Sequence, residues 1–182
     1  ITIAPSALTT NMNVSTVPVG AVINSMTITL NINHTNDNDL VLNLRAPNGA
    51  VLNLVNQRGG SGNNFVNTVI SSLGGSPFTN NGAPFTGTYT ADRSSNVGTP
   101  NSGVNVNFAN LYSVLNGTWT LGAEDDNFTN IGTILNWSLT FNYTIPNTPL
   151  AVTWSPITDL YTDPGATVSY TGTILATVYA KP

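Results

Sequence analysis

The sequence predicts an all-β fold, a jelly-roll-like β-sandwich with a short β-rich C-terminal segment. Three observations lead to this prediction. Apolar residues alternate with Thr, Ser and Asn in several stretches, Asn and Gly gather between those stretches, and only 7% of the 182 residues are charged. Alternation at period two is typical of half-buried strands, and Asn and Gly favour tight turns. Helical bundles and coiled coils are excluded, because they need many Glu, Lys and Arg residues.

Strands are predicted in chain order wherever the alternation is clear. The first spans residues 26–32, where every second residue is apolar and the others are Thr or Asn. Residues 40–44 repeat the pattern, and the Asn-Gly pair within 46–49 suits a tight hairpin that leads into a return strand at 52–54. Loops are predicted at residues 58–64, 73–84 and 92–103. Residues 109–115 form at most one helical turn.

The clearest predicted strand lies at residues 135–143. We expect Trp137 to be buried on its inner face and Asn136 to face solvent. The residues predicted to point inward are Leu135, Trp137, Leu139, Phe141 and Tyr143. The prolines at 146 and 149 then predict a linker.

The chain is therefore divided into a β-sandwich domain at 1–145, a linker at 146–149 and a β segment at 150–182. Short strands are predicted in this last segment at 152–155, 167–170 and 173–179. Because thirty-odd residues bury too little apolar surface to be stable alone, the segment is expected to pack on the main domain or to begin a further module or repeat.

Composition excludes several partners. With only 4 Lys and Arg residues, the chain has too few positive charges for a surface that binds nucleic-acid phosphates. No run of about 20 apolar residues is present to span a membrane. The absence of Cys excludes disulfides and thiolate metal sites. The chain begins at Ile1, as a mature or excised segment would.

The sequence predicts no enzyme. His34 is the one histidine, and the sequence lacks the Gly-x-Ser-x-Gly motif that exposes a nucleophilic serine at a tight turn. We expect His34 to donate to a backbone carbonyl at a strand end. The acids of 124–126 are paired carboxylates of the kind used in glycoside hydrolysis, but the aromatic and cationic residues of a sugar cleft are missing around them.

Acidic residues are scarce, and most of them cluster. Five of the eight lie in two short loops next to predicted strands. Carboxylates with intervening Asn residues are the ligands that Ca²⁺ prefers, whereas the alternative is that they are ordinary turn residues. We predict that Asp39 meets Asp125 or Asp126 across one end of the sandwich and that Ca²⁺ is a cofactor there. The candidate ligands are Asp37, Asp39, Glu124, Asp125 and Asp126.

A series of short motifs occurs in a recognisable order. The motifs are His34-Thr35, Asp39-Leu40, Ala46-Pro47-Asn48-Gly49, Gly59-Gly60, Asn64-Phe65, Pro84-Phe85-Thr86-Gly87-Thr88-Tyr89, Asn116-Gly117-Thr118-Trp119-Thr120-Leu121 and Gly132-Thr133-Ile134-Leu135-Asn136-Trp137-Ser138-Leu139. The series covers residues 1–145 and resembles the P domain of proprotein convertases, the P/Homo B family. It departs from the family at Asn38, where Gly often precedes the Asp-Leu pair.

The resemblance implies a jelly-roll sandwich without catalytic residues. In convertases such a domain follows a subtilisin-like catalytic domain and stabilises it. Many secreted bacterial proteins carry the module as an accessory domain of proteases, adhesins and surface proteins. The tail, at 152–156, 160–163 and 178–182, is similar to segments of large surface proteins of gliding and related Bacteroidota, which the type IX system exports.

These resemblances lead us to expect a non-catalytic structural or interaction module of a secreted or cell-surface bacterial protein, with an extracellular or cell-surface location. It would support adhesion, or dock to neighbouring domains of the same chain or to a partner surface protein. Two alternatives remain open. One is a calcium-dependent glycan- or peptide-binding module, with Asn residues, Trp154 and exposed Tyr residues as a sugar platform. The other is an accessory P domain of a subtilisin-like serine protease.

Overall fold

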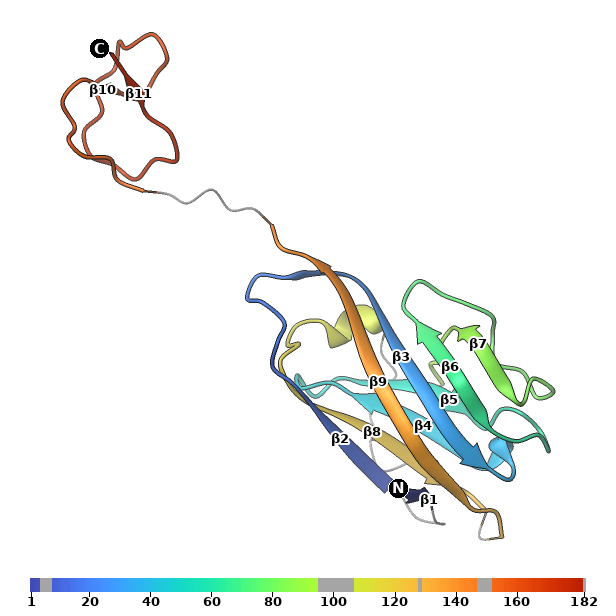
Figure 1. The fold of residues 1–182 in the computed structure, drawn as a ribbon. Coiled ribbons are helices and arrows are strands. Elements are labelled where there is room, and N and C mark those ends of the chain that lie inside the picture. The colour runs from blue at the N-terminus through green and yellow to red at the C-terminus, as the bar shows by residue number, and fades with distance from the viewer. Residues whose placement is uncertain (4–7, 95–106, 128, 147–151, 182) are drawn as a thin grey trace. The chain divides into compact units, whose positions relative to one another are not determined.

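A computed structural model describes residues 1–3, 8–94, 107–127, 129–146 and 152–181 (Figure 1). The chain forms two compact units, Ile1–Ile145 and Pro146–Pro182. Where the structure describes them, both units consist of strands, turns and loops apart from two short 3₁₀ helices, which confirms the predicted all-β class. Within the described residues, no helix has the length and apolar character needed to cross a membrane.

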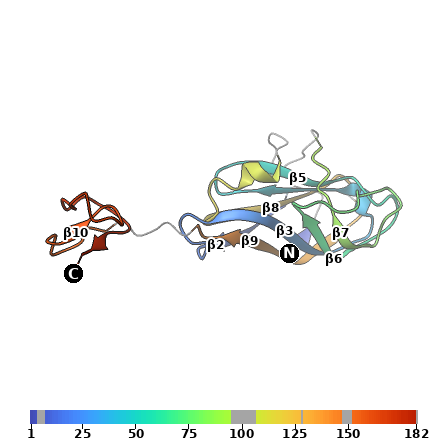
Figure 2. The same cartoon turned by 90° about the horizontal axis from the view of Figure 1, so that it is seen from above.

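The first unit is a sandwich of two sheets, which Figure 2 shows as stacked layers. Neighbouring strands are antiparallel except β6 and β7, which run parallel. The five-stranded sheet has the order β1 (Thr2–Ile3), β9 (Gly132–Thr144), β3 (Val22–His34), β6 (Phe65–Ser71) and β7 (Phe85–Tyr89). The four-stranded sheet has the order β2 (Leu8–Val14), β8 (Gly117–Asp125), β4 (Leu40–Arg45) and β5 (Val51–Asn56).

The core fills the space between the two sheets. Strand β3 contributes four apolar side chains that are fully buried, and Trp119 of β8 is the largest fully buried residue. Its indole N–H donates to the carbonyl of Leu115 at 2.8 Å, so the polar atom of this ring is satisfied where it is buried. The predicted phase of residues 26–32 is confirmed: the four β3 residues are Met26, Ile28, Leu30 and Ile32.

Strand β9 is present where the alternation predicted a strand, but its predicted phase is wrong at one position and its burial is wrong at another. The pairing between β3 and β9 shifts between Ile134 and Asn136, which leaves Leu135 as the extra residue of a β-bulge. Leu135 is consequently 56% exposed and does not point inward. Trp137 does face the core, but it is only half-buried; at this position β9 pairs with β3 alone among the described strands.

Strands β4 and β5 are buried on both faces, which simple alternation does not predict. Asn43 and Asn53 are 0% exposed, and the Asn53 amide donates to the Asn43 side-chain oxygen at 2.9 Å. Residues 92–94 cover them from outside, where the Ser94 N–H donates to the Asn53 side chain. The rest of the loop predicted at 92–103 lies outside the described residues from position 95 onward.

The helical turn predicted at 109–115 is the 3₁₀ helix η2 (Phe108–Leu111). A second 3₁₀ helix, η1 (Asp37–Asp39), joins β3 to β4. The strands β1, β2, β6 and β7 were not predicted.

The second unit contains little regular structure. Among residues 152–181, one strand pair joins β10 (Leu160–Tyr161) to β11 (Tyr179–Ala180). The strands predicted at 152–155 and 167–170 are reduced to isolated bridges at Val152 and Ser169. Tyr170 is 2% exposed and is the one buried hydrophobic residue among the described part of this unit.

Candidate functional site

A cluster of buried polar side chains lies at one end of the sandwich. Strand β3 ends at His34, η1 follows directly, and β8 ends at Asp125. Leu40, the first residue of β4, pairs with Asp125. The fold therefore brings the two acidic loops of the sequence to the same end of the molecule, although they are far apart in the chain.

His34 and Asp125 form a buried pair at the centre of this cluster. The His34 Nε2 atom lies 3.1 Å from Asp125 Oδ2, and the two residues are 2% and 4% exposed. His34 Nδ1 lies 2.8 Å from the carbonyl oxygen of Asn36, so the expected contact with a backbone carbonyl is present. Both ring nitrogens are thus engaged within the protein, and the ring links β3 to β8.

Asp37 is the most deeply buried acidic residue of the cluster. It is 0% exposed, and its Oδ1 atom accepts the backbone N–H of Asn64 at 2.9 Å. Its Oδ2 atom has no hydrogen-bond partner. Burial raises the pKa of the Asp37 carboxyl to about 7, against smaller lowering effects of the Asn64 N–H and of His34. Loss of hydration penalises the charged form of a buried acid.

Two more of the predicted calcium ligands have their own donors. Asp39 Oδ2 accepts the Asn130 amide at 2.6 Å, and Asp126 Oδ2 accepts the Gln57 amide. The Asp126 N–H also donates to the Asp39 carbonyl at 2.9 Å, so these two loops do meet.

The structure does not gather the predicted ligands around one point. Glu124 lies within β8, opposite Val41. Among the described residues, no group of three or more acidic or histidine side chains is arranged to hold a metal ion. Calcium binding stays a prediction. The buried side-chain oxygens that have no partner at this end are Asn36 Oδ1 and Asp37 Oδ2.

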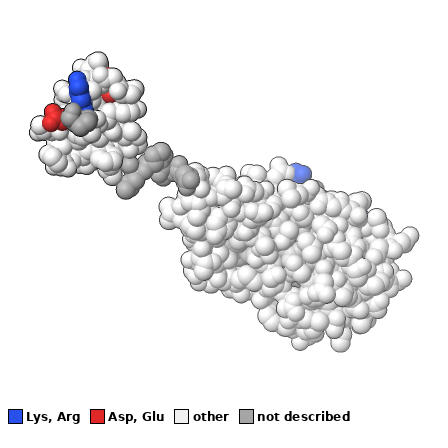
Figure 3. All heavy atoms as spheres, turned by 45° about the horizontal axis from the view of Figure 1, so that its top comes forward, with Lys and Arg blue, Asp and Glu red and all other residues white. Residues whose placement is uncertain are grey.

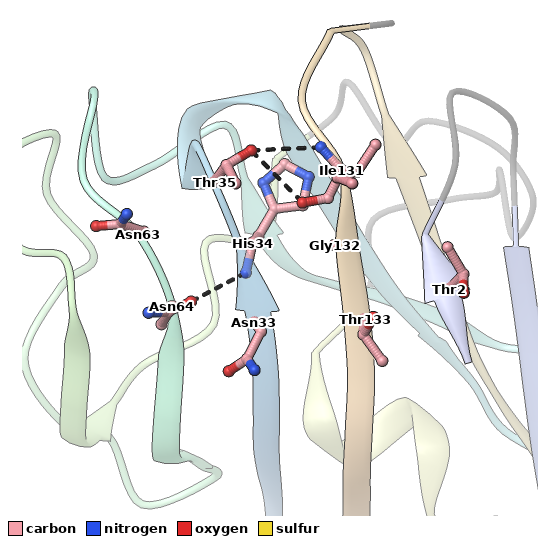
Figure 4. A pocket seen from close by; sticks show the side chains of 9 residues that line it. All are labelled: Thr2, Asn33, His34, Thr35, Asn63, Asn64, Ile131, Gly132 and Thr133. Carbon is pink, nitrogen blue, oxygen red and sulfur yellow. Dashed lines mark hydrogen bonds between the residues drawn. The ribbon is translucent and has the colours of Figure 1, made fainter.

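A cavity of about 620 Å³ opens beside the cluster (Figure 4). It crosses the ends of β1, β9 and β3 and the loop before β6. Its lining contains Asn and Thr side chains, one exposed Ile and no acidic or basic residue other than His34. The lining residues are Thr2, Asn33, His34, Thr35, Asn63, Asn64, Ile131, Gly132 and Thr133.

Some lining side chains are held in place and others are free. The Asn64 side-chain oxygen accepts the His34 backbone N–H at 3.0 Å, and the Thr35 hydroxyl meets the backbone of Ile131, as Figure 4 shows. The side-chain amides of Asn33 and Asn63 form no hydrogen bond with another described residue. Sequence reasoning missed this cavity, because its residues come from four segments and share no local motif.

Comparisons with known proteins agree with the order of the motifs. Residues 23–141 match the family model described as the proprotein convertase P-domain. The chain is 30% identical over 146 residues to leupeptin-inactivating enzyme 1 of Streptomyces exfoliatus, an alignment that covers 73% of this chain and 25% of that protein. The chain thus spans about a quarter of the length of this curated relative. It belongs to the proprotein convertase P-domain family.

Proposed function

We propose that the chain is a non-catalytic accessory domain that docks to a neighbouring domain of a longer, exported bacterial protein and stabilises it. The observation that carries this proposal is its membership of the P-domain family. The match to one quarter of a relative that is named as an enzyme supports it, because that relative has room for a separate catalytic domain.

The state of His34 supports the absence of catalysis. A general base must reach the proton that it removes, but both nitrogens of this ring contact Asn36 and Asp125 inside the protein. The family membership and the buried histidine therefore favour a supporting role.

The absence of catalysis is tested on the 182-residue chain itself. Purified protein is assayed with fluorogenic peptide and glycoside substrates beside the His34→Ala and Asp125→Asn variants. We expect no turnover above buffer in any sample. Turnover that one of these substitutions abolishes would overturn the proposal.

A second candidate function is the binding of a neutral glycan or peptide in the cavity beside His34. The free amides of Asn33 and Asn63 favour it, since amide groups can both donate and accept hydrogen bonds. A glycan array and a peptide array with and without EDTA test it. Binding that is lost in the Asn33→Ala, Asn63→Ala double variant supports this function, provided that it survives in Asn142→Ala, which changes an exposed Asn at the other end of β9.

The calcium dependence of this second candidate is centred on Asp37. Its partnerless Oδ2 atom and the nearby Asn36 Oδ1 are hard oxygen donors of the kind that Ca²⁺ selects, whereas Asp39, Asp125 and Asp126 already accept hydrogen bonds or face His34. If the ion binds here, EDTA lowers the melting temperature of the wild-type chain but leaves that of Asp37→Asn unchanged. An EDTA effect of equal size in both proteins would place the ion elsewhere.

The parent protein is proposed to act outside the cell. The similarity of the tail to exported surface proteins of gliding Bacteroidota supports a cell-surface location, type IX export and a role in adhesion. Fractionation of the native organism with an antibody against residues 1–145 tests the location. Detection in the cytosol alone would contradict it.

A further inference from the structure

Asn-Gly pairs occur three times in the chain, at 48–49, 81–82 and 116–117. In such a pair the backbone nitrogen of the glycine can reach the carbonyl carbon of the asparagine side chain, because glycine has no Cβ to restrict the approach. The two atoms can then join in a five-membered succinimide ring. Whether the ring forms in a folded protein depends on how firmly the asparagine amide and the glycine N–H are held.

Asn48 is held by hydrogen bonds at both ends of its side-chain amide. Its Nδ2 atom donates to the carbonyl of Asn110 at 2.8 Å, and its Oδ1 atom accepts the N–H of Ala50 at 2.9 Å. The Gly49 N–H is engaged as well, since it donates to the carbonyl of Ala46 at 2.9 Å. Both groups that would close the ring are therefore bound to other partners.

Asn116 is held in a similar way by the loop between β2 and β3. Its Nδ2 atom donates to the carbonyl of Val17 at 2.8 Å, and its Oδ1 atom accepts the N–H of the same residue at 3.1 Å. The side chain cannot turn toward Gly117 without breaking both of these hydrogen bonds.

Asn81 lacks restraints of this kind. It lies in the loop that joins β6 to β7 (Figure 1), and it is exposed. In the part of the chain that the structure describes, its side chain forms no hydrogen bond. The N–H of Gly82 donates to the carbonyl of Thr79 over a long distance of 3.3 Å. Neither of the two groups that would close the ring is firmly held.

The turn at 79–82 packs directly on the glycine-rich loop at 57–64. The carbonyl of Thr79 accepts the N–H of Gly59 at 3.1 Å. A Cβ atom added to Gly60 would lie only 2.5 Å from the carbonyl oxygen of Asn80. The two segments therefore touch through their backbones, and a change in the length of one backbone must displace the other.

The loop at 57–64 in turn holds η1 and one wall of the cavity. The N–H of Gly62 donates to the carbonyl of Gly59 at 3.0 Å, and the N–H of Asp37 donates to the carbonyl of Gly62 at 2.9 Å. Together with the bond to Thr79, these form a continuous series from the turn to η1. The loop ends in two of the residues that line the cavity.

We propose that Asn81 is a modification site, at which the folded chain converts this asparagine without an enzyme to aspartate and isoaspartate, and that the conversion loosens the loop at 57–64. Asn48 and Asn116 stay intact in the folded chain. The proposal depends neither on the docking role nor on a ligand in the cavity.

The reaction at Asn81 needs only water as a co-reactant. The nitrogen of Gly82 attacks the Cγ atom of Asn81, so that the N–Cγ bond forms and the Cγ–Nδ2 bond breaks. Ammonia leaves with the proton of the Gly82 N–H. Water then opens the ring at either carbonyl. One product is aspartate, and the other is isoaspartate, in which the backbone runs through Cγ and is one methylene longer.

Peptide mapping by mass spectrometry tests the site. Trypsin cleaves after Arg45, Arg58 and Arg93, so the three Asn-Gly pairs fall in three different peptides. The folded 182-residue chain is incubated in mildly alkaline buffer beside the same chain in urea. In the folded chain we expect conversion at Asn81 to be about tenfold or more faster than at the other two pairs, where two hydrogen bonds must first break. In urea the three rates should be similar.

The converted chain can be isolated by its charge. Conversion adds one negative charge to a chain with a formal net charge of −4, and the visible face of the first unit has almost no charged side chains (Figure 3). Anion exchange therefore separates it from the unconverted chain, and an isoaspartate methyltransferase identifies the isoaspartate form.

Hydrogen exchange of the isoaspartate form tests the effect on the loop. The backbone amides of residues 59–62 and of Asp37 should exchange about two- to tenfold faster than in the fresh chain, the factor that loss of one hydrogen bond gives. Amides of β8 should not change. The control is Asn81→Gln, which removes no hydrogen bond and closes a ring far more slowly; after the same incubation it should show neither conversion nor faster exchange.

Two results would overturn the modification site: no conversion at Asn81 in the folded chain, or conversion at Asn48 or Asn116 at the same rate as at Asn81. Unchanged exchange in the isolated isoaspartate form would overturn the inferred effect on the loop.

Discussion

His34 and Asp125 are separated by 91 positions in the sequence and touch through their side chains. The sequence predicts that His34 makes a backbone contact at a strand end, because no nucleophile motif accompanies this single histidine and a catalytic role is therefore not expected. It does not predict the partner on β8, since that contact depends on which strands are neighbours. The clustering of the acids was visible in the sequence. The separate donor of each carboxylate was not.

Tryptophan burial gives the first residue-scale prediction. Trp119 is 0% exposed, so Trp119→Ala should cost about 3–5 kcal/mol of unfolding free energy. Trp137 of β9 is half-buried, and Trp137→Ala should cost less, about 0.5–3 kcal/mol. Urea unfolding of the two variants measures both values, and Asn136→Ala on the outer face should stay within about 0.5 kcal/mol. A larger loss at Trp137 than at Trp119 would contradict this assignment of the core.

Asp37 makes the stability of the first unit depend on pH. Its folded pKa of about 7 is above the ordinary value of 3.8, so the unfolded state loses its proton first as the pH rises. The contribution of Asp37 to the free energy of unfolding is therefore highest below about pH 4 and decreases as the pH rises to about 7. Asp37→Asn should remove this decrease while still accepting the Asn64 N–H.

Melting curves at pH 5 and pH 8 in EDTA measure the effect. The melting temperature of Asp37→Asn, relative to that of the wild type, should be higher at pH 8 than at pH 5. A difference between the two proteins that is the same at both pH values would show that Asp37 does not titrate in this range.

At the scale of the elements, β3 was the most predictable strand, because only one of its two faces is fully buried and its residues therefore alternate clearly. The prediction for β4 and β5 was incomplete, since residues 92–94 cover their outer face. The bulge at Leu135 could not be read from the sequence, because an uninterrupted alternating pattern is also compatible with regular pairing. Strand β7 is short, and its parallel partner β6 is set by the loop that joins them.

The parallel pair gives a prediction at this scale. Thr68 of β6 is 0% exposed, and its hydroxyl donates to the carbonyl of Phe85 at 2.6 Å. Thr68→Val keeps the shape of the side chain and removes this donor, so it should cost about 1–3 kcal/mol. Thr88→Val, at an exposed position on β7, is the matched control and should change stability by about 0.5 kcal/mol or less. Chemical unfolding of both variants decides whether the hydroxyl supports the pair, and equal values would show that it does not.

At the scale of the whole molecule, the all-β class and the P-domain family were both recognisable from the sequence. Alternation and turn composition are local properties, and the family motifs keep their order along the chain. The cavity was not recognisable, because it arises from how strands are ordered within a sheet. The second unit shows fewer strands than its alternation predicts, since its apolar residues have few neighbours to pack against.

The central claim is that residues 1–145 support a neighbouring domain, and calorimetry of the full-length natural protein tests it most directly. The comparison uses the intact protein, the same protein without this segment, and the 182-residue chain alone. A docked accessory domain predicts that the intact protein unfolds in one coupled transition at a higher temperature than either separate part. Two independent transitions, each at the temperature of the isolated part, would contradict the claim.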